Sequence, residues 1–287
     1  MDAPHGSARI ALLTALAMVA FAGNSILCRV ALRQTTIDAA TFTSVRILAG
    51  AVALAIVVRL RHGSLASAGN WGSAIALFVY AAGFSFAYLS LSAGTGALLL
   101  FGAVQMTMIV IGLRSGERLH GRQWIGLALA LAGLVGLVLP GVTAPPLAGS
   151  LLMLSAGAAW GVYSIRGRGQ RDPIRVTAGN FLLATPIAAL LSLAGWRAAS
   201  WDSAGVGYAI VSGALTSGIG YAIWYTALPG LRATSAAAVQ LSVPVLAALG
   251  GVVLLGETVT PRLALTAAAV LSGIAMVVTA RGRGTNR

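Results

Sequence analysis

Residues 96–117 read GALLLFGAVQMTMIVIGLRSGE, and residues 236–257 read AAAVQLSVPVLAALGGVVLLGE. Each stretch is a long apolar run that ends in Gly-Glu and is followed within a few residues by a new apolar run. A membrane-spanning helix needs about 20 apolar residues, so each stretch predicts one span. The two stretches align with each other when residue 117 is placed on residue 257, which indicates an internal repeat.

Other parts of the chain align at nearly the same shift. Ala22-Gly23 matches Trp160-Gly161, a shift of 138, and Phe84 and Tyr88 match Tyr221 and Tyr225, a shift of 137. The shift varies by a few residues because the loops of the two repeats differ slightly in length. We therefore divide the chain into a first repeat over residues 1–140 and a second repeat over residues 141–287.

The composition excludes a water-soluble protein. Apolar residues make up 58% of the 287 residues and charged residues only 9%, whereas soluble proteins carry about 25% charged residues. The single cysteine, Cys28, permits no internal disulfide. The sequence shows no metal-ligand cluster, no nucleophile with a base and no phosphate-binding glycine loop, so we expect no metal, no cofactor and no enzyme activity.

Ten apolar runs follow one another along the chain, separated by clusters of Arg, Pro, Gly and Asp. Only helices satisfy the backbone hydrogen bonds of such runs within one segment, so the predicted fold is all-α and polytopic. Because each repeat holds an odd number of helices, the second repeat enters the membrane from the opposite side, which is an inverted-topology repeat of five plus five helices. The predicted spans are 10–31, 38–58, 71–91, 95–113, 121–139, 147–165, 173–194, 204–226, 234–255 and 260–280.

The basic residues predict the orientation of these spans. The net charge is +13, and all 19 basic residues are Arg. If the N-terminus is inside, 14 of them lie in inside segments and only four, Arg29, Arg33, Arg197 and Arg262, lie in outside loops. This bias places both termini in the cytoplasm and the chain in the inner (plasma) membrane. It also accounts for the charge without a nucleic-acid partner.

Several short motifs together resemble the EamA-type ten-helix branch of the drug/metabolite transporter superfamily. They are Ala22-Gly23-Asn24, Trp160-Gly161, Arg46 in the second span, Pro244 within the ninth span, and the helix-terminal Gly-Glu pairs. The resemblance covers nearly the whole chain, but Val104 stands where the second repeat has Pro244. It implies a central cavity lined by spans one, three, four, six, eight and nine. It also implies export of amino acids or related metabolites, with the aromatic amino-acid exporters as the nearest branch.

Polar and aromatic side chains at membrane depth are the candidates for substrate binding, because each costs free energy there unless it is paired or wet. Core packing and hydrogen bonds between helices are the structural alternatives for all of them. Pro244 frees a backbone carbonyl and is the candidate hinge, with a simple packed kink as the alternative. The candidate substrate-binding residues are Asn24, Tyr80, Phe84, Gln105, Trp160, Tyr163, Tyr221, Gln240 and Ser242.

Three charged residues are interpreted as structural. Arg46 is the only ionisable side chain well inside a predicted span. It could meet a substrate carboxylate, but the second span is peripheral in the resembled family, so we favour a structural role. Glu117 and Glu257 end helices, where a carboxylate opposes the helix dipole. We expect each carboxylate to be offset by the N-terminus of the next helix or by a nearby Arg.

These observations predict an inner-membrane secondary transporter that exports a small metabolite, most simply an amino acid, by alternating access. A flippase of lipid-linked carriers and an intramembrane enzyme are the alternatives. No carboxylate or His is predicted at mid-depth, which favours transport down the substrate's own gradient. The expected partners are the substrate and the lipid bilayer. A monomer is favoured over a dimer, although two GxxxG matches leave a dimer face open.

Overall fold

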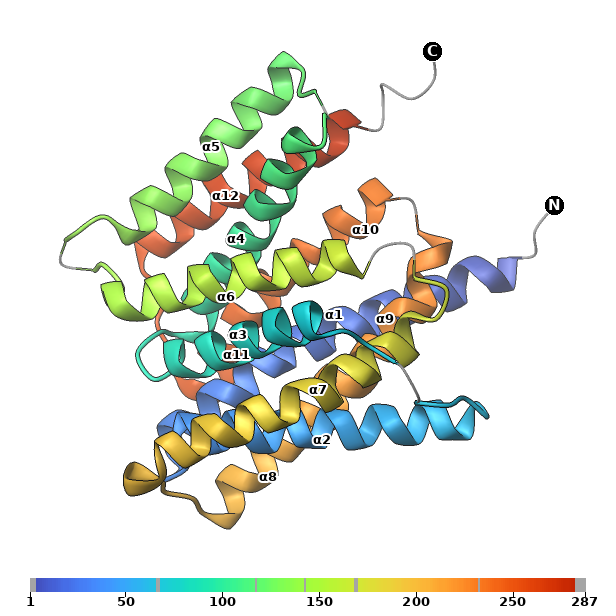
Figure 1. Cartoon of the computed structure of the whole chain (residues 1–287). Helices are drawn as coiled ribbons and strands as arrows, with labels where there is room; N and C mark the ends of the chain where they lie inside the picture. Colours follow the sequence, from blue (N-terminus) through green and yellow to red (C-terminus); the bar gives the residue numbers. More distant parts are fainter. Residues whose placement is uncertain are drawn as a thin grey trace.

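The computed structural model of the chain describes residues 4–65, 68–116, 118–141, 143–167, 170–231 and 233–281. Within these ranges all regular structure is helical and there is no strand, which confirms the all-α prediction (Figure 1). Glu117 lies outside the described residues. The major helices are α1 (Pro4–Gln34), α2 (Ala39–Leu60), α3 (Trp71–Ala87), α4 (Ala93–Arg114), α5 (Gly121–Val138), α6 (Leu147–Arg166), α7 (Pro173–Ala194), α8 (Ser203–Val211), α9 (Gly220–Ala227), α10 (Ala233–Gln240), α11 (Ser242–Leu255) and α12 (Pro261–Arg281).

The described residues form ten long apolar segments, as the sequence predicts. Nine are long and apolar enough to cross a membrane, and α3, with 17 residues, is the shorter tenth. Helix α1 begins and α12 ends at the same end of the bundle (Figure 1). The chain is therefore a multi-pass membrane protein. On which side of the membrane these ends lie remains a prediction from the Arg count.

The helix ends follow local chemistry that the sequence displays. Asp38, Asn70 and Ser92 are N-caps whose side chains accept hydrogen bonds from backbone N–H groups of the first turn. At the other end of the ninth span, Gly256 adopts a left-handed conformation (φ 63°) and stops α11. Gly116 also has a positive φ, 90°, just after α4. The two Gly-Glu pairs thus mark helix ends because glycine adopts this conformation without strain.

The ninth span is interrupted, which the sequence suggested only through Pro244. The span 234–255 was predicted as one helix, but α10 ends at Gln240 and α11 begins at Ser242. Pro244 has no N–H to bond the carbonyl four residues earlier, that of Gln240, so the regular ladder cannot continue through this point. Leu241 N–H instead bonds the Ala238 carbonyl three residues back. Pro244 lies at a helix break, and a hinge motion there remains a prediction.

The eighth span contains a segment that the sequence analysis did not anticipate. Between α8 and α9, the segment η2 (Ser212–Ile219) is a π-helix, which carries one extra residue per turn. It packs against α2 at very close range, because a Cβ atom on Gly213 would lie 2.1 Å from the Arg46 carbonyl oxygen. Glycine is therefore required at position 213 to bring η2 against the backbone that carries Arg46.

The two predicted repeats are interleaved in space. The most extensive contacts, α5 with α12, α2 with α7, and α3 and α4 with α6, all join the first repeat to the second. Helix α1 likewise packs on α8, η2, α9 and α11, and α11 also packs on α4. We name two groups from these contacts: the α6 group (α3, α4 and α6) and the α1 group (α1, α8, η2, α9 and α11). Each group takes helices from both repeats, and the two groups meet between α11 and α4.

Candidate functional site

A small central cavity lies between the two groups. From the α1 group it is lined by Phe21, Asn24, Ser25, Thr216 and Tyr221, and from the α6 group by Tyr80, Phe84, Leu100, Phe101 and Trp160. Its volume is about 20 Å³. That is enough for about one water molecule and far below the 300 Å³ or more of typical ligand sites. The structure therefore shows this cavity closed around its own side chains.

A buried polar network crosses the cavity wall. Asn24 donates from Nδ2 to the Tyr80 hydroxyl oxygen (3.2 Å), and its Oδ1 accepts from the hydroxyls of Ser212 (2.7 Å) and Thr216 (3.3 Å). The Tyr80 oxygen also accepts from Arg46 Nη2 (3.1 Å). The network joins α1, α3, α2 and η2. Asn24 thus bonds both to its own group, through η2, and to the α6 group, through Tyr80.

Aromatic rings form the rest of the wall, with Trp160 at their centre. The indole lies 4.7 Å from the Tyr80 ring, 5.0 Å from the Tyr221 ring and 5.2 Å from the Tyr163 ring, all measured between centroids. Rings at these distances attract each other beyond the effect of their burial. The Trp160–Tyr221 and Asn24–Tyr80 contacts both connect the two groups, so the cavity is closed by rings and by one hydrogen bond.

The structure brings five of the nine predicted binding residues to the cavity: Asn24, Tyr80, Phe84, Trp160 and Tyr221. Phe84 and Tyr221, which the repeat places in equivalent positions, both line it. The other four do not. Gln105 is buried in α4, Tyr163 contacts Thr177 and Asn180 through its hydroxyl, and Ser242 donates to the Val239 carbonyl. Gln240, at the end of α10, is half-buried and outside the cavity lining.

Sequence reasoning missed several residues of the wall. Phe21 and Ser25 lie three residues before and one after Asn24 on α1, so the helical period was a signal that could have identified them. Ser212 and Thr216 are hydroxyls in a glycine-rich part of the eighth span. Their position relative to Asn24 depends on the π-helix, which the hydrophobic pattern does not predict.

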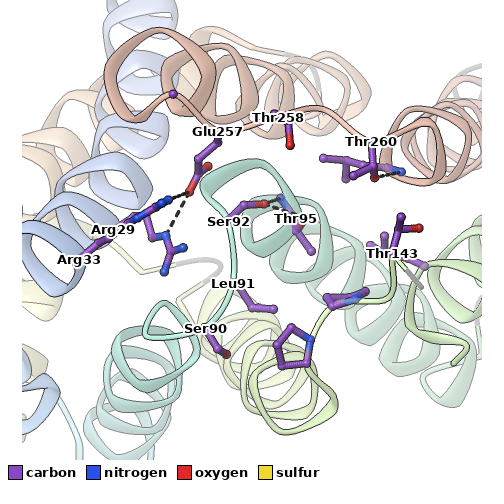
Figure 2. Close-up of a pocket in the computed structure, with 15 residues that line it drawn as sticks. Arg29, Arg33, Ser90, Leu91, Ser92, Thr95, Thr143, Glu257, Thr258 and Thr260 are labelled. Atoms are coloured by element: carbon purple, nitrogen blue, oxygen red, sulfur yellow. Dashed lines mark hydrogen bonds and ion pairs between the residues drawn. The ribbon is translucent and has the colours of Figure 1, made fainter. Parts of the chain in front are cut away.

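A second, larger pocket of about 320 Å³ opens at one end of the bundle (Figure 2). Its wall comes from the end of α1, the α3–α4, α5–α6 and α11–α12 connections, and the start of α4. Along α1, Ser25 lines the central cavity and Arg29, one helical turn later, lines this end pocket. The two spaces are thus separated by about one turn of helix.

Glu257 and Arg29 form an ion pair in the wall of the end pocket (Figure 2). Arg29 Nε lies 3.1 Å from Glu257 Oε1, and both side chains are mostly buried. The pair reaches across to the α6 group at two points. Glu257 Oε2 accepts from the Ala93 N–H at the start of α4 (2.8 Å), and Arg29 Nη1 donates to the Tyr88 carbonyl at the end of α3 (2.7 Å).

Glu257 therefore has the two kinds of partner that the sequence predicted, a nearby Arg and a helix N-terminus. The N-terminus is that of α4, however, and not that of the next helix along the chain. A glycine makes the contact possible, because a Cβ atom on Gly251 would lie 2.5 Å from Glu257 Oε2. The matching prediction for Glu117 lies outside the described residues.

Hydrogen bonds without an ion pair join the helices at the opposite end. Arg166, in the last turn of α6, donates to Asn70 Oδ1 (3.0 Å) and to the Ser73 hydroxyl (3.2 Å) at the start of α3. The Asn70 N–H donates to Asn180 Oδ1 on α7 (2.9 Å). In the described ranges no group of three or more His, Cys, Asp or Glu side chains could hold a metal ion.

An all-helical multi-pass fold around a central aromatic and polar cavity is the architecture expected of a membrane transporter. The model of the EamA-like transporter family matches residues 8–139 and again residues 147–279, and the chain belongs to this family. One match falls within each predicted repeat. The chain is thus a member of a family of membrane transporters rather than of enzymes.

Individual relatives match different shares of the chain. "Uncharacterized protein PA1977" of Pseudomonas aeruginosa is 58% identical over 274 residues, covering 95% of this chain and 96% of that protein. The threonine/homoserine exporter RhtA of Escherichia coli K12 is 30% identical over 172 residues, which span only 57% of this chain and 56% of RhtA. One solved crystal structure shares the fold, with a TM-score of 0.69 over 96% of this chain and 99% of that chain at 19% identity. None of these matches tests the aromatic amino-acid exporter branch.

Proposed function

We propose that the protein exports small amino acids across the inner membrane by alternating access, with the central cavity as the substrate site. The observation that carries the proposal is the position of this cavity, which is buried between two groups of helices and lined from both. A site between two such groups is exposed to either side in turn when the groups rock against each other.

The rocking bodies are the α1 group and the α6 group rather than the two sequence repeats. In transporters built from inverted repeats, alternating access is commonly a rocking of one repeat or bundle against the other. The contacts favour a different division, because helices of different repeats pack more extensively on each other than helices of the same repeat. The groups remain related by the repeat, since α3, α4 and α6 correspond to the eighth, ninth and first spans.

Contacts between the groups at one end suit a state that is closed at that end. The Arg29–Glu257 pair bonds to α3 and α4 at the end that the Arg count places outside. In the central cavity between the ends, room for a substrate requires the rings around Trp160 to separate. We propose that this separation accompanies the opening of one end.

The lining suits a small molecule with a polar head and an apolar side chain. Asn24 and Thr216 offer amide and hydroxyl groups, and Phe84, Phe101 and Tyr221 offer apolar surface. The partial match to RhtA, an exporter of threonine and homoserine, supports amino acids as the first candidates. A lipid-linked carrier is the less favoured alternative, because its headgroup would require a basic pocket open to lipid.

Two further proposals concern the surroundings of the protein. We propose that the bilayer covers the apolar flanks, where Val253 and Leu265 are 78% and 74% exposed, and that the protein works as a monomer.

We also propose that the substrate gradient drives export. The described acidic side chains, Asp38, Asp172, Asp202 and Glu257, all lie at helix ends, where they accept hydrogen bonds, so a proton or sodium carrier at mid-depth would have to be another group.

Counterflow in proteoliposomes tests the proposed function. Vesicles loaded with unlabelled L-threonine, L-homoserine or L-phenylalanine are diluted into a trace of the same labelled amino acid. Protein-dependent accumulation of label is expected for at least one of them, and N24A should reduce the initial rate at unchanged protein level. If none of the three accumulates, the amino-acid assignment is wrong. If label accumulates at the same rate in N24A as in the wild type, the central cavity is not the substrate site.

A further inference from the structure

Arg46 is a fully buried cation in the middle of α2. Only 2% of its surface is exposed, and it lies among the largest side chains that are excluded from solvent. One guanidinium nitrogen, Nη2, donates to the Tyr80 hydroxyl oxygen, while Nη1 has no hydrogen-bond partner. A buried donor without a partner on a charged group is costly, and it calls for an explanation by function or by a missing ligand.

No described carboxylate neutralises this charge. The four acidic side chains in the described ranges are committed elsewhere: Asp38, Asp172 and Asp202 cap α2, α7 and α8, and Glu257 pairs with Arg29. The hydrogen-bond partner of Arg46 is the Tyr80 hydroxyl, which is not a carboxylate. The rings of Phe84 and Tyr80, whose centroids lie 4.7 and 5.3 Å from the guanidinium carbon, supply only partial compensation.

The guanidinium lies directly behind the wall of the central cavity. Its two ring neighbours, Tyr80 and Phe84, both line that cavity, and Tyr80 is also bonded to Asn24. Gly213 of η2 packs closely on the backbone of Arg46, and the Tyr80 hydroxyl and the rings of Tyr80 and Phe84 hold the guanidinium. Separation of the rings around the cavity would bring a bound molecule to the unpartnered Nη1.

We propose that Arg46 binds the carboxylate of the transported molecule, with the unpartnered Nη1 as the donor. The inference rests on the proposed function and deepens it, because it assigns the substrate class as carboxylates. It also replaces the structural role that the sequence suggested for Arg46. A substrate carboxylate supplies both the missing acceptor and the missing counter-charge, so the cation is compensated when the site is loaded.

Two pairs of probes test the role of Arg46, each pair differing only in the carboxylate: L-threonine against L-threoninamide, and propionate against propionamide. The half-saturating concentration of each probe is measured by ligand-dependent thermal stabilisation of the purified protein. The wild type should prefer the acid of at least one pair by about tenfold or more. R46Q should weaken the acid by about 10- to 100-fold, the range expected for a charge-assisted hydrogen bond, and change the amide little.

Two variants act as controls. R46K keeps the charge without the planar fork and should retain part of the preference for the acid. R59Q removes an exposed arginine from the same helix and should behave as the wild type. If R46Q does not fold, the wild-type preference and R46K remain decisive, since equal binding of acid and amide by the wild type in both pairs overturns the inference without any variant.

The outcomes separate this inference from the proposed function. In one outcome, R46K retains a preference for propionate over propionamide, and threonine does not bind. This outcome supports the role of Arg46 and rejects amino acids as the substrate. Threonine binding with the same acid-to-amide ratio in R46Q as in the wild type supports amino-acid transport and overturns the role of Arg46.

Discussion

Replacing Glu257 with Gln should open the end of the protein that the Arg29–Glu257 pair holds closed. The carboxylate accepts from Arg29 Nε and from the Ala93 N–H, and it is only 7% exposed. Glutamine has nearly the same shape, but it retains only one acceptor oxygen, so the variant removes the charge and replaces one of the two accepting oxygens with an NH2 group. The Ala93 contact connects the α1 group to the α6 group, so its weakening favours separation of the groups at this end.

The size of the effect follows from the contacts. A hydrogen bond to a charged group contributes about 1.5–3 kcal/mol and a neutral one about 0.5–1.5 kcal/mol, so losing the charge costs the closed state about 1–2 kcal/mol. Arg29 loses its counter-charge at the same time, although its bond to the Tyr88 carbonyl remains. An opening equilibrium shifted by this amount changes about 5- to 30-fold.

Cysteine accessibility measures this shift directly. Cys28 is the only cysteine in the chain and is buried, so C28A gives a background free of thiols. Ser25 is 1% exposed and lines the central cavity, and S25C reports on its access. A membrane-impermeant thiol reagent added to intact cells should label S25C about 5- to 30-fold faster in E257Q than in the parent.

Arg33 provides the matched control. Its Nη1 lies 4.0 Å from Glu257 Oε1, but its side chain is 52% exposed, and exposed ion pairs contribute little. R33Q should therefore change the labelling rate less than about threefold. R29Q should match E257Q, and the double variant should add little to either. Equal labelling of S25C in E257Q and its parent, at equal protein level, would show that this pair does not hold the end closed.

Three other perturbations give separate expected outcomes. Y80F removes the oxygen that accepts from both Asn24 and Arg46, so it should reduce thermal stability in detergent. The expected loss is about 1–3 kcal/mol for each donor left unpaired. The control Y208F, at the half-buried Tyr208, should leave the stability unchanged. G213A places a Cβ atom 2.1 Å from the Arg46 carbonyl oxygen and should abolish the monodisperse peak in size-exclusion chromatography, while G207A, at a glycine with open space, should not. Partial burial raises the pKa of Asp38, but hydrogen bonds from Thr41, Ser200 and Ala40 outweigh it and hold the pKa below its usual value. The charge-dependent stability that Asp38 provides should thus be complete above its unfolded pKa of about 3.9 and be lost as pH falls through the lower folded pKa. Melting of D38A and of the wild type from pH 7 to pH 2 tests this, and a constant difference between the two would contradict it.

Most of the helical framework could be predicted from the sequence, because each determinant is local. Apolar length, N-caps such as Asp38, and the glycine before Glu257 all act within one or two turns. Five of the nine predicted binding residues line the cavity, since aromatic and amide side chains in apolar spans are conspicuous.

The rest depends on packing between distant segments. The pairing of Glu257 with the start of α4 joins residues 164 positions apart. The π-helix at Ser212–Ile219 packs against α1 and α2, which lie far from it in the sequence. Gln105 and Gln240 carry the same amide as Asn24, and only the three-dimensional arrangement distinguishes the residue that faces the cavity from those that do not.

The interleaved packing has a consequence for how the protein assembles during synthesis. When the ribosome has delivered only the first five spans, α2, α3, α4 and α5 still lack their main packing partners. Those partners are α6, α7 and α12, which belong to the second half of the chain and have not yet been made. Glycine and other small residues on those surfaces then face lipid, and contacts of high sequence separation form last. The helices of the first half therefore remain loosely associated in the bilayer until the second half inserts among them. A chain cut near residue 140 should therefore be degraded when its first fragment is made alone and be rescued when both fragments are made together.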